Sequence, residues 1–268
     1  MPVGLDHIVA ATRARLSSNR LNVRALERRA ADHQPRGFSV ALRRAAEDRV
    51  AVIAELKKAS PSRGVIRENF NVGVLAFGLA SSGAAALSIL TDEEFFQGSL
   101  DNLAEASAAT ALPCLRKDFI VDEAQVVEAR AWRADAILLI VAALSQPQLQ
   151  ALLRHARELE LDVLCEVHDD QELARALDAG CEIIGVNSRD LRTFQVDLAT
   201  AIALAPQIPA SVLRVAESGI HSGTDIRALR EAGYDAFLIG ESLMKAADPG
   251  RALAGLVAEA QAKTVSGF

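Results

Sequence analysis

Val50-Ala-Val-Ile-Ala-Glu-Leu56 is a short run of β-branched and apolar residues, the kind of segment that forms a fully buried strand. A polar or glycine-containing segment follows it, and then an amphipathic helical stretch. This order returns along the chain at spacings of roughly 20 to 30 residues, the length of a strand–helix unit. The apolar runs that begin the units are Val50–Leu56, Ala84–Leu90, Pro113–Arg116, Ala136–Val141, Asp162–Val167, Glu182–Val186, Val212–Ala216 and Ala236–Ile239.

Eight such units predict the fold class. Alternating strands and helices favour a parallel sheet, and eight units close a (β/α)8 TIM barrel. An open, doubly wound sheet is the alternative. We expect the barrel over residues 49–268 and a helical extension over residues 1–48, within a single domain. Its one or two helices would pack on the barrel through one apolar face, formed by Leu5, Ile8, Val9 and Leu16.

Composition and charge argue against several classes of protein. The net charge of −6 disfavours a nucleic-acid partner or a polybasic membrane surface. The longest wholly apolar run, Ala136–Leu144, has nine residues, whereas a transmembrane helix needs about 20. The amino terminus lacks a secretory pattern, and the odd set Cys114, Cys165 and Cys181 has no metal-type spacing. We expect a cytoplasmic protein with no membrane or nucleic-acid partner.

Polar side chains stand at the ends of the predicted strands, where barrel enzymes hold their chemistry. Alternation along the first strand places Glu55 and Lys57 on the inward side with Ile53. A buried acid and amine are costly unless they are paired or used. Lys117 shares a face with Leu115 in the third strand. Later strands end at Glu166, Asn187, Glu217 and Glu241.

Several strand-end residues also have a plain structural interpretation. We expect Arg116 to be solvated, His168 to be a surface or capping residue, and Asn187 to be compatible with a simple turn. Cys165 alternates to the helix-facing side of its strand and should belong to the core. The whole set of charged strand ends nevertheless favours an active site, because packing alone predicts no such regularity.

The two segments after the last two strands, Ser218-Gly219 and Gly240-Glu241-Ser242, suit a phosphate. In such barrels these loops commonly bind phosphate through exposed backbone N–H groups. The nucleotide patterns Gly-x-Gly-x-x-Gly and the P-loop are absent from the sequence, as is Gly-x-Ser-x-Gly, and the five histidines are scattered. No cofactor and no metal are therefore expected.

These motifs together resemble those of the indole-3-glycerol-phosphate synthase family, from about residue 5 to about residue 255. The stretches that carry the resemblance are Ile53–Gly64, Ser88–Asp92, Phe95–Ser99, Leu115–Ile120, Cys165–His168, Gly185–Leu191, Ala216–Ile220 and Leu238–Met244. The resemblance implies a barrel with an extra amino-terminal helical segment and a carboxy-lyase of tryptophan biosynthesis. Its phosphorylated small-molecule substrate would be 1-(2-carboxyphenylamino)-1-deoxyribulose 5-phosphate. The products would be indole-3-glycerol phosphate, carbon dioxide and water.

The resemblance also implies roles for the catalytic residues. Lys117 corresponds to the general acid that protonates the ketone oxygen during ring closure, and Glu166 to the carboxylate of the dehydration step. Lys57 would lie near the substrate carboxylate and share the acid role, while Glu55 would pair with the lysines. Asn187 and Glu217 would complete the catalytic set and hold the anilino nitrogen and hydroxyl region. The residues implied to bind the substrate are Ser60, Arg189, Ser218, Gly219, Gly240 and Ser242.

The chemistry sets expectations for the pKa values. A lysine can protonate a carbonyl near neutral pH if burial and a second cation lower its pKa. We expect this of Lys117 or Lys57, and we expect a raised pKa at Glu166.

We also expect the protein to be a monomer.

Two other functions are weighed against this one. Phosphoribosylanthranilate isomerase would need a catalytic cysteine, but Cys165 points toward the helices and Cys114 lies inside a strand. A non-catalytic ligand-binding barrel would use the charged strand ends for affinity alone.

Overall fold

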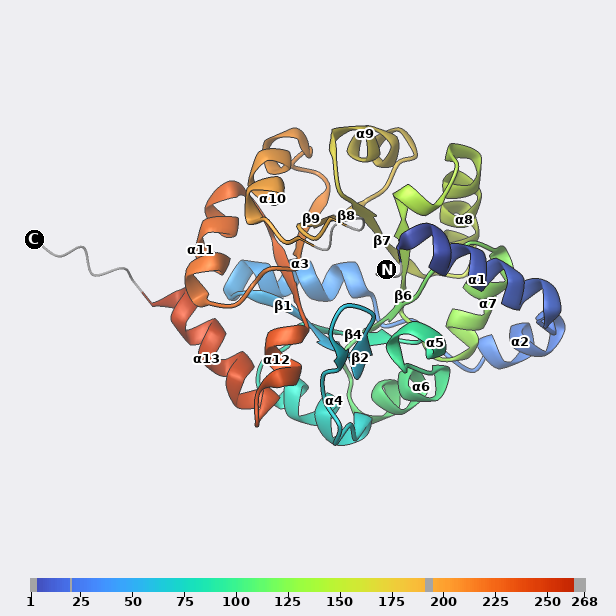
Figure 1. Ribbon diagram of the computed structural model, residues 1–268, viewed down its shortest axis with the longest axis horizontal. Coiled ribbons are helices and arrows are strands. Elements are labelled where there is room, and N and C mark those ends of the chain that lie inside the picture. Colours follow the sequence, from blue (N-terminus) through green and yellow to red (C-terminus); the bar gives the residue numbers. More distant parts are fainter. Residues whose placement is uncertain (1–3, 20, 191–194, 263–268) are drawn as a thin grey trace, which may run out of the picture.

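The computed structural model of the protein describes residues 4–19, 21–190 and 195–262, and its centre is a closed barrel of eight parallel strands (Figure 1). Each strand pairs with the next one along the chain, and the last strand, β10, pairs with the first, β1. The strands are β1 (Ala51–Leu56), β4 (Ala86–Leu90), β5 (Cys114–Lys117), β6 (Ala136–Ile140), β7 (Asp162–Val167), β8 (Ile183–Asn187), β9 (Leu213–Glu217) and β10 (Ala236–Ile239). The TIM barrel is confirmed, and the open sheet is excluded because β1 and β10 are hydrogen-bonded.

Helices surround the barrel and begin with the caps that the sequence favours. Asp169 accepts a hydrogen bond from the backbone of Glu172, and Ser222 forms a capping box with Asp225. The helices between and after the strands are α4 (Val72–Ser81), α5 (Glu93–Phe96), α6 (Leu100–Ala109), α7 (Glu123–Ala131), α8 (Gln146–Glu158), α9 (Asp170–Asp178), α10 (Leu198–Leu204), α11 (Gly223–Ala232), α12 (Glu241–Lys245) and α13 (Pro249–Gln261). Short 3-10 helices cover Val141–Ala143 and Ala205–Gln207. None of the helices in the described residues is long and apolar enough to cross a membrane.

The apolar residues form two layers because side chains alternate along each strand. Ile53, Leu115 and Leu164 fill the barrel interior. The intervening residues, Cys165 among them, pack between strands and helices as expected. This alternation also sends the polar strand-end residues inward.

Three helices precede β1 in the described part of the extension, one more than the upper expectation. They are α1 (Leu5–Ser18), α2 (Val23–Ala30) and α3 (Phe38–Asp48). Phe38 and Leu42 of α3 are fully buried against the barrel-interior residues, so α3 closes one end of the barrel. The division into an extension at 1–48 and a barrel at 49–268 stays a prediction, and residues 1–3, 20, 191–194 and 263–268 of it lie outside the described part.

A small hairpin follows β1, formed by β2 (Ala59–Ser60) and β3 (Gly64–Val65). Arg67, just after the hairpin, donates hydrogen bonds to the backbone carbonyls of Met244 and Ala246 at 3.1 and 2.8 Å. The hairpin is therefore fastened to the end of α12, beside the carboxyl ends of the strands.

The expectation that Arg116 is solvated is wrong. Its side chain is 2% exposed and lies between β5 and α7, where Nη2 is 2.9 Å from carboxylate oxygens of both Asp118 and Glu128. Glu128 lies on a different element, so the sequence alone gave no sign of this partner.

Candidate active site

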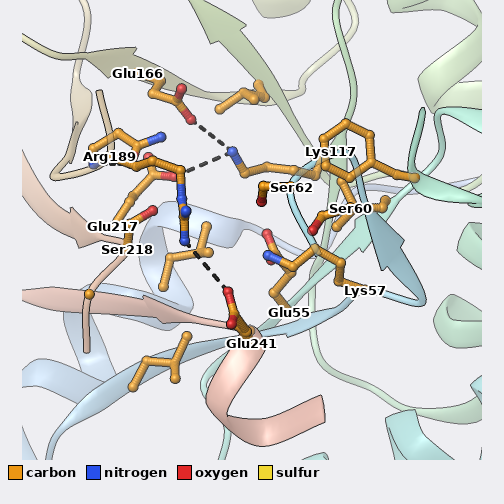
Figure 2. Close-up of a pocket in the computed structure, with 18 of the residues that line it drawn as sticks. Glu55, Lys57, Ser60, Ser62, Lys117, Glu166, Arg189, Glu217, Ser218 and Glu241 are labelled. Carbon is orange, nitrogen blue, oxygen red and sulfur yellow. Dashed lines mark hydrogen bonds and ion pairs between the residues drawn. The ribbon is translucent and has the colours of Figure 1, made fainter. Parts of the chain in front are cut away.

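Lys117 lies at the centre of the candidate site (Figure 2). Its Nζ donates a hydrogen bond to Oε2 of Glu166 at 2.8 Å and lies 3.4 Å from Oε2 of Glu217. These residues come from the carboxyl ends of β5, β7 and β9. Three separate strands thus bring one ammonium group and two carboxylates to one end of the barrel.

A second charge pair lies at the carboxyl end of β1, where Glu55 belongs to the strand and Lys57 follows it. Nζ of Lys57 donates a hydrogen bond to Oε1 of Glu55 at 2.6 Å. Glu55 fits because Gly240 has no side chain, and a Cβ there would overlap Oε1 of Glu55. A Cβ at Gly185 would likewise overlap Oε1 of Glu217. Gly185, to which the sequence gave no role, therefore makes room for a carboxylate of the site.

Lys117 and Glu166 stabilise each other's charges. Burial opposes the charge on Lys117, but Glu166, Glu217 and Glu55 outweigh it and raise the pKa of the lysine well above its usual range. Burial also opposes ionisation of Glu166, yet Lys117 and His168 outweigh it and lower the pKa of that carboxyl. Both expected directions are wrong, because the lysine's neighbours are three carboxylates rather than a second cation.

Glu217 has the raised pKa instead. Burial is the largest cause, Lys117 acts against it, and the nearby charges of Glu166 and Glu55 add to it, so the pKa of Glu217 rises to about 8. Its Oε1 atom is buried and has no hydrogen-bond partner among the described residues. A protonated carboxyl with an unused polar atom in a pocket can donate a hydrogen bond or a proton to a bound molecule.

His168 lies closer to the site than a surface position would allow. Its side chain is 13% exposed, with Nδ1 3.0 Å from Oε2 of Glu172 and Nε2 3.4 Å from Oε1 of Glu166. Burial disfavours the imidazolium, but the two carboxylates outweigh it and raise the pKa of His168 to about 10. The contact with α9 agrees with a capping position, whereas the contact with Glu166 was not predicted.

The candidate phosphate loops lie on the same side of the barrel. Ser218 and Gly219 follow β9 with φ angles of 66° and 78°, and such left-handed backbone is costly for a serine, by roughly 1–3 kcal/mol. Oγ of Ser242 donates a hydrogen bond to the carbonyl of Ile220 at 3.2 Å, which joins the two loops. Nη2 of Arg189 lies 3.5 Å from Oε2 of Glu241 at the start of α12 (Figure 2).

The same pocket has an apolar part. It includes Leu5 and Ile8 of α1, together with Phe96 and Phe119, whose ring centroids are 6.0 Å apart. None of the four was predicted as a site residue. Their apolar character is common to the core, and only the folded chain brings α1 and α5 to this end of the barrel.

Every residue that the sequence assigned to the site lines this one pocket. The twelve are Glu55, Lys57, Ser60, Lys117, Glu166, Asn187, Arg189, Glu217, Ser218, Gly219, Gly240 and Ser242. Their proximity alone assigns no role to any of them.

The fold and the site define a TIM-barrel enzyme whose pocket combines acid–base groups with loops suited to an anion. Comparison with known proteins gives the family: residues 5–256 match the family model described as indole-3-glycerol phosphate synthase. The chain belongs to this family, and it is therefore a carboxy-lyase of tryptophan biosynthesis.

Curated relatives agree over almost the whole chain. The indole-3-glycerol phosphate synthase of Koribacter versatilis is 56% identical over 255 residues, covering 94% of this chain and 98% of the relative. That of Acidithiobacillus ferrooxidans is 51% identical over 253 residues, covering 93% and 96%. Among solved structures, 3-hexulose-6-phosphate synthase from Salmonella typhimurium has a TM-score of 0.62 at 14% identity, over 78% of this chain and 99% of that chain. Such a distant likeness supports the barrel fold alone.

Proposed function

We propose that the pocket binds 1-(2-carboxyphenylamino)-1-deoxyribulose 5-phosphate and closes its indole ring through Lys117, Glu166 and Glu217. The observation that carries this proposal is the position of Lys117, whose Nζ faces the carboxyl groups of Glu166 and Glu217. The pKa of Glu166 is lowered and that of Glu217 is raised. A charged lysine, an ionised glutamate and a protonated glutamate are the acid and base groups that ring closure and dehydration require.

The substrate's three parts match three parts of the pocket. The aromatic ring suits the apolar part at Phe96 and Phe119. The phosphate suits the loops at Ser218–Gly219 and Gly240–Ser242, where backbone N–H groups can approach an anion. Lys57, Arg189 and Ser60 would bind the carboxylate, and Asn187 would bind the anilino region. Anchoring both anions would bring the reacting ends together, which lowers the entropic cost of ring closure.

Ring closure needs a proton at the ketone. The ring carbon that bears the carboxylate attacks the ketone carbon, Lys117 gives its proton to the ketone oxygen, and carbon dioxide then leaves from the same ring carbon, which restores the aromatic ring. Because its pKa is raised, Lys117 holds this proton at all ordinary pH values, and the alkoxide that develops during attack is basic enough to take it.

Dehydration needs one acid and one base. Glu217, with a pKa of about 8, would give a proton to the departing hydroxyl, which leaves as water. Glu166, ionised beside Lys117 and His168, would take the proton whose loss completes the indole. The two carboxyl groups thus exchange protonation states, which a proton passing from Glu166 back to Glu217 restores. Lys117 regains from solvent the proton that it gave to the ketone oxygen, so one proton is consumed for each carbon dioxide released.

Two variants test these roles. Lys117→Met should lower kcat by about 10³-fold or more, and Glu166→Gln by about 10²–10⁴-fold, because each removes a proton-transfer group. Formation of indole-3-glycerol phosphate, followed by its fluorescence, measures the rate, while inhibition by inorganic phosphate checks that the pocket is intact. A normal rate in either variant would refute the corresponding role.

The alternatives predict different results. An isomerase would convert phosphoribosylanthranilate, but Cys114 and Cys165 are fully buried on the helix-facing side of the strands. A non-catalytic barrel would bind the substrate without product. One assay with both substrates separates the three functions.

We also propose a monomer in the cytoplasm. Cys114, Cys165 and Cys181 are all free and buried, as suits a reducing compartment. Gel filtration with light scattering tests the monomer, and cell fractionation tests the location.

A further inference from the structure

His168 contacts the catalytic candidate Glu166 from the side opposite to Lys117. Oε2 of Glu166 accepts the hydrogen bond of Lys117 at 2.8 Å, while Oε1 lies 3.4 Å from Nε2 of His168. Each oxygen of this carboxylate therefore faces one cationic group. At 3.4 Å the contact with His168 is a charge contact rather than a short hydrogen bond.

The imidazole is itself held in place by the first turn of α9. Nδ1 of His168 lies 3.0 Å from Oε2 of Glu172, and the same oxygen accepts a hydrogen bond from the backbone N–H of His168 at 2.9 Å. The backbone of Glu172 in turn donates to Asp169, the N-cap of the helix, at 2.8 Å. The helix start therefore fixes which way Nε2 points.

Charges alternate along this line of side chains. From the barrel interior outward they are Lys117, Glu166, His168 and Glu172. The charged groups that face the imidazole are Glu166 of β7 and Glu172 of α9, and Glu217 of β9 lies beyond Lys117. The side chain of His168 does not line the pocket, and it reaches the reacting groups through its contact with Glu166.

We propose that His168 is a positioning residue, which holds Oε1 of Glu166 so that Oε2 faces Lys117. This inference rests on the proposed catalytic role of Glu166. An opposite charge within about 4–6 Å lowers the pKa of a carboxyl by about one to three units, so loss of the imidazolium should raise the pKa of Glu166 by about one unit or more.

Three variants separate the contacts of the imidazole. In His168→Asn, the amide nitrogen can take the place of Nδ1 and keep Glu172, but nothing reaches Glu166. In His168→Gln, the amide nitrogen can take the place of Nε2 and keep a neutral donor to Glu166. Glu172→Gln keeps the hydrogen bond to Nδ1 and removes the charge that favours the imidazolium.

The measurement is kcat/KM between pH 5 and 9, expressed as the ratio of each variant to the wild type, which cancels ionisation of the substrate. For His168→Asn we expect kcat lowered about 10- to 100-fold at every pH, with KM changed less than about twofold, because Glu166 stays ionised but is no longer held toward Lys117. His168→Gln and Glu172→Gln should show smaller effects in the same direction. A kcat within about twofold of the wild type in His168→Asn, or a loss that His168→Gln does not partly restore, in whichever variants fold, would overturn the proposal and leave His168 a structural residue.

A double-variant cycle distinguishes failure of this inference from failure of the proposed function. If His168 acts through Glu166, adding His168→Asn to Glu166→Gln should change the remaining rate by less than about twofold. If Glu166→Gln alone keeps the full rate, the catalytic role of Glu166 is wrong. In that case, titration of ¹³C-labelled glutamate carboxyls, assigned with Glu166→Gln, still tests the contact. A lower pH midpoint for Glu166 in the wild type than in His168→Asn supports it, and equal midpoints refute it.

Discussion

Each end of the barrel has a buried carboxylate, but the two carboxylates differ in how many hydrogen-bond partners they have. At the end closed by α3, Asp135 is 0% exposed, and its oxygens accept hydrogen bonds from the backbone N–H of Arg36 at 2.8 Å, from the Arg36 side chain and from the backbone of Cys114. Nε2 of His33 lies 3.1 Å away. At the other end, Glu217 has a buried oxygen without a partner among the described residues.

The pKa values follow this difference. Burial disfavours the charge on Asp135, but hydrogen bonds with His33 and Arg36 outweigh it and lower the pKa of Asp135. Burial and neighbouring carboxylates raise the pKa of Glu217 to about 8. A buried carboxylate with all its partners stabilises the fold, whereas one left short of partners is available for a ligand. In barrels, chemistry and stability separate to opposite ends in this way.

The largest effect should come from changing Asp135, the buried carboxylate that has all its hydrogen-bond partners. Asp135→Asn removes the charge that faces Arg36 and His33, and it should lower the free energy of unfolding by about 3 kcal/mol, because it leaves the half-buried guanidinium of Arg36 without its carboxylate. Urea unfolding measures this, and kcat of the folded protein should stay within about twofold of the wild type. Since the folded-state pKa of Asp135 is lowered, its stabilisation is present above the ordinary aspartate pKa of about 3.9 and is lost at lower pH. Loss of activity without loss of stability would contradict the comparison.

A smaller effect is expected from adding a methyl group next to Glu217, the buried carboxylate that lacks a hydrogen-bond partner on one oxygen. Gly185→Ala places a Cβ against Oε1 of Glu217, so the carboxyl must move away from Lys117, and kcat should fall about 10- to 100-fold. Gly255→Ala is the matched control, because that glycine of α13 has open space at its Cβ position. This control should keep the wild-type rate and gain up to about 1 kcal/mol of helix stability. Equal rates in the two variants would show that the position of Glu217 is unimportant.

The smallest effect is a pH dependence that comes from Glu217. As the pH rises through about 8, its ionisation adds a negative charge beside Glu166, so kcat/KM should fall several-fold by pH 9, when the anionic substrate is repelled. Glu217→Gln should abolish this alkaline decrease while it lowers the rate at neutral pH. The free energy of unfolding should also fall as the pH rises. Because the folded state raises the pKa of Glu217, its contribution to stability is complete below the ordinary glutamate pKa and is lost as the pH rises to about 8. Unfolding curves at pH 6 and 9 should therefore converge in Glu217→Gln, and a decrease that persists in the variant would assign it to another group.

The alternation of side chains along the strands predicted much of the fold and many of the residues that line the pocket. Strand alternation alone predicted that Glu55 and Lys57 point into the barrel and that Lys117 shares the face of Leu115, and all three line the pocket. It also predicted the helix-facing position of Cys165. Such predictions succeed because the direction of a side chain on a strand depends only on its neighbours in sequence.

Other features depend on distances between elements and could not be predicted in this way. Arg116 is buried because Glu128 of α7 lies beside it, and His168 approaches Glu166 because α9 holds its ring. Leu5 reaches the pocket because α1 crosses to that end of the barrel. Each partner comes from another element, so no local pattern reveals it.

The amino-acid sequence by itself determined the eight strand–helix units and the polar side chains at the carboxyl ends of the strands, because periodicity is a local property. It left open whether the sheet closes, which the pairing of β10 with β1 decided. Only the tertiary structure decided which of those groups hold protons. The charge state of Lys117, Glu166 and Glu217 is set by Coulomb interactions among strands that are far apart in sequence and a few ångströms apart in space.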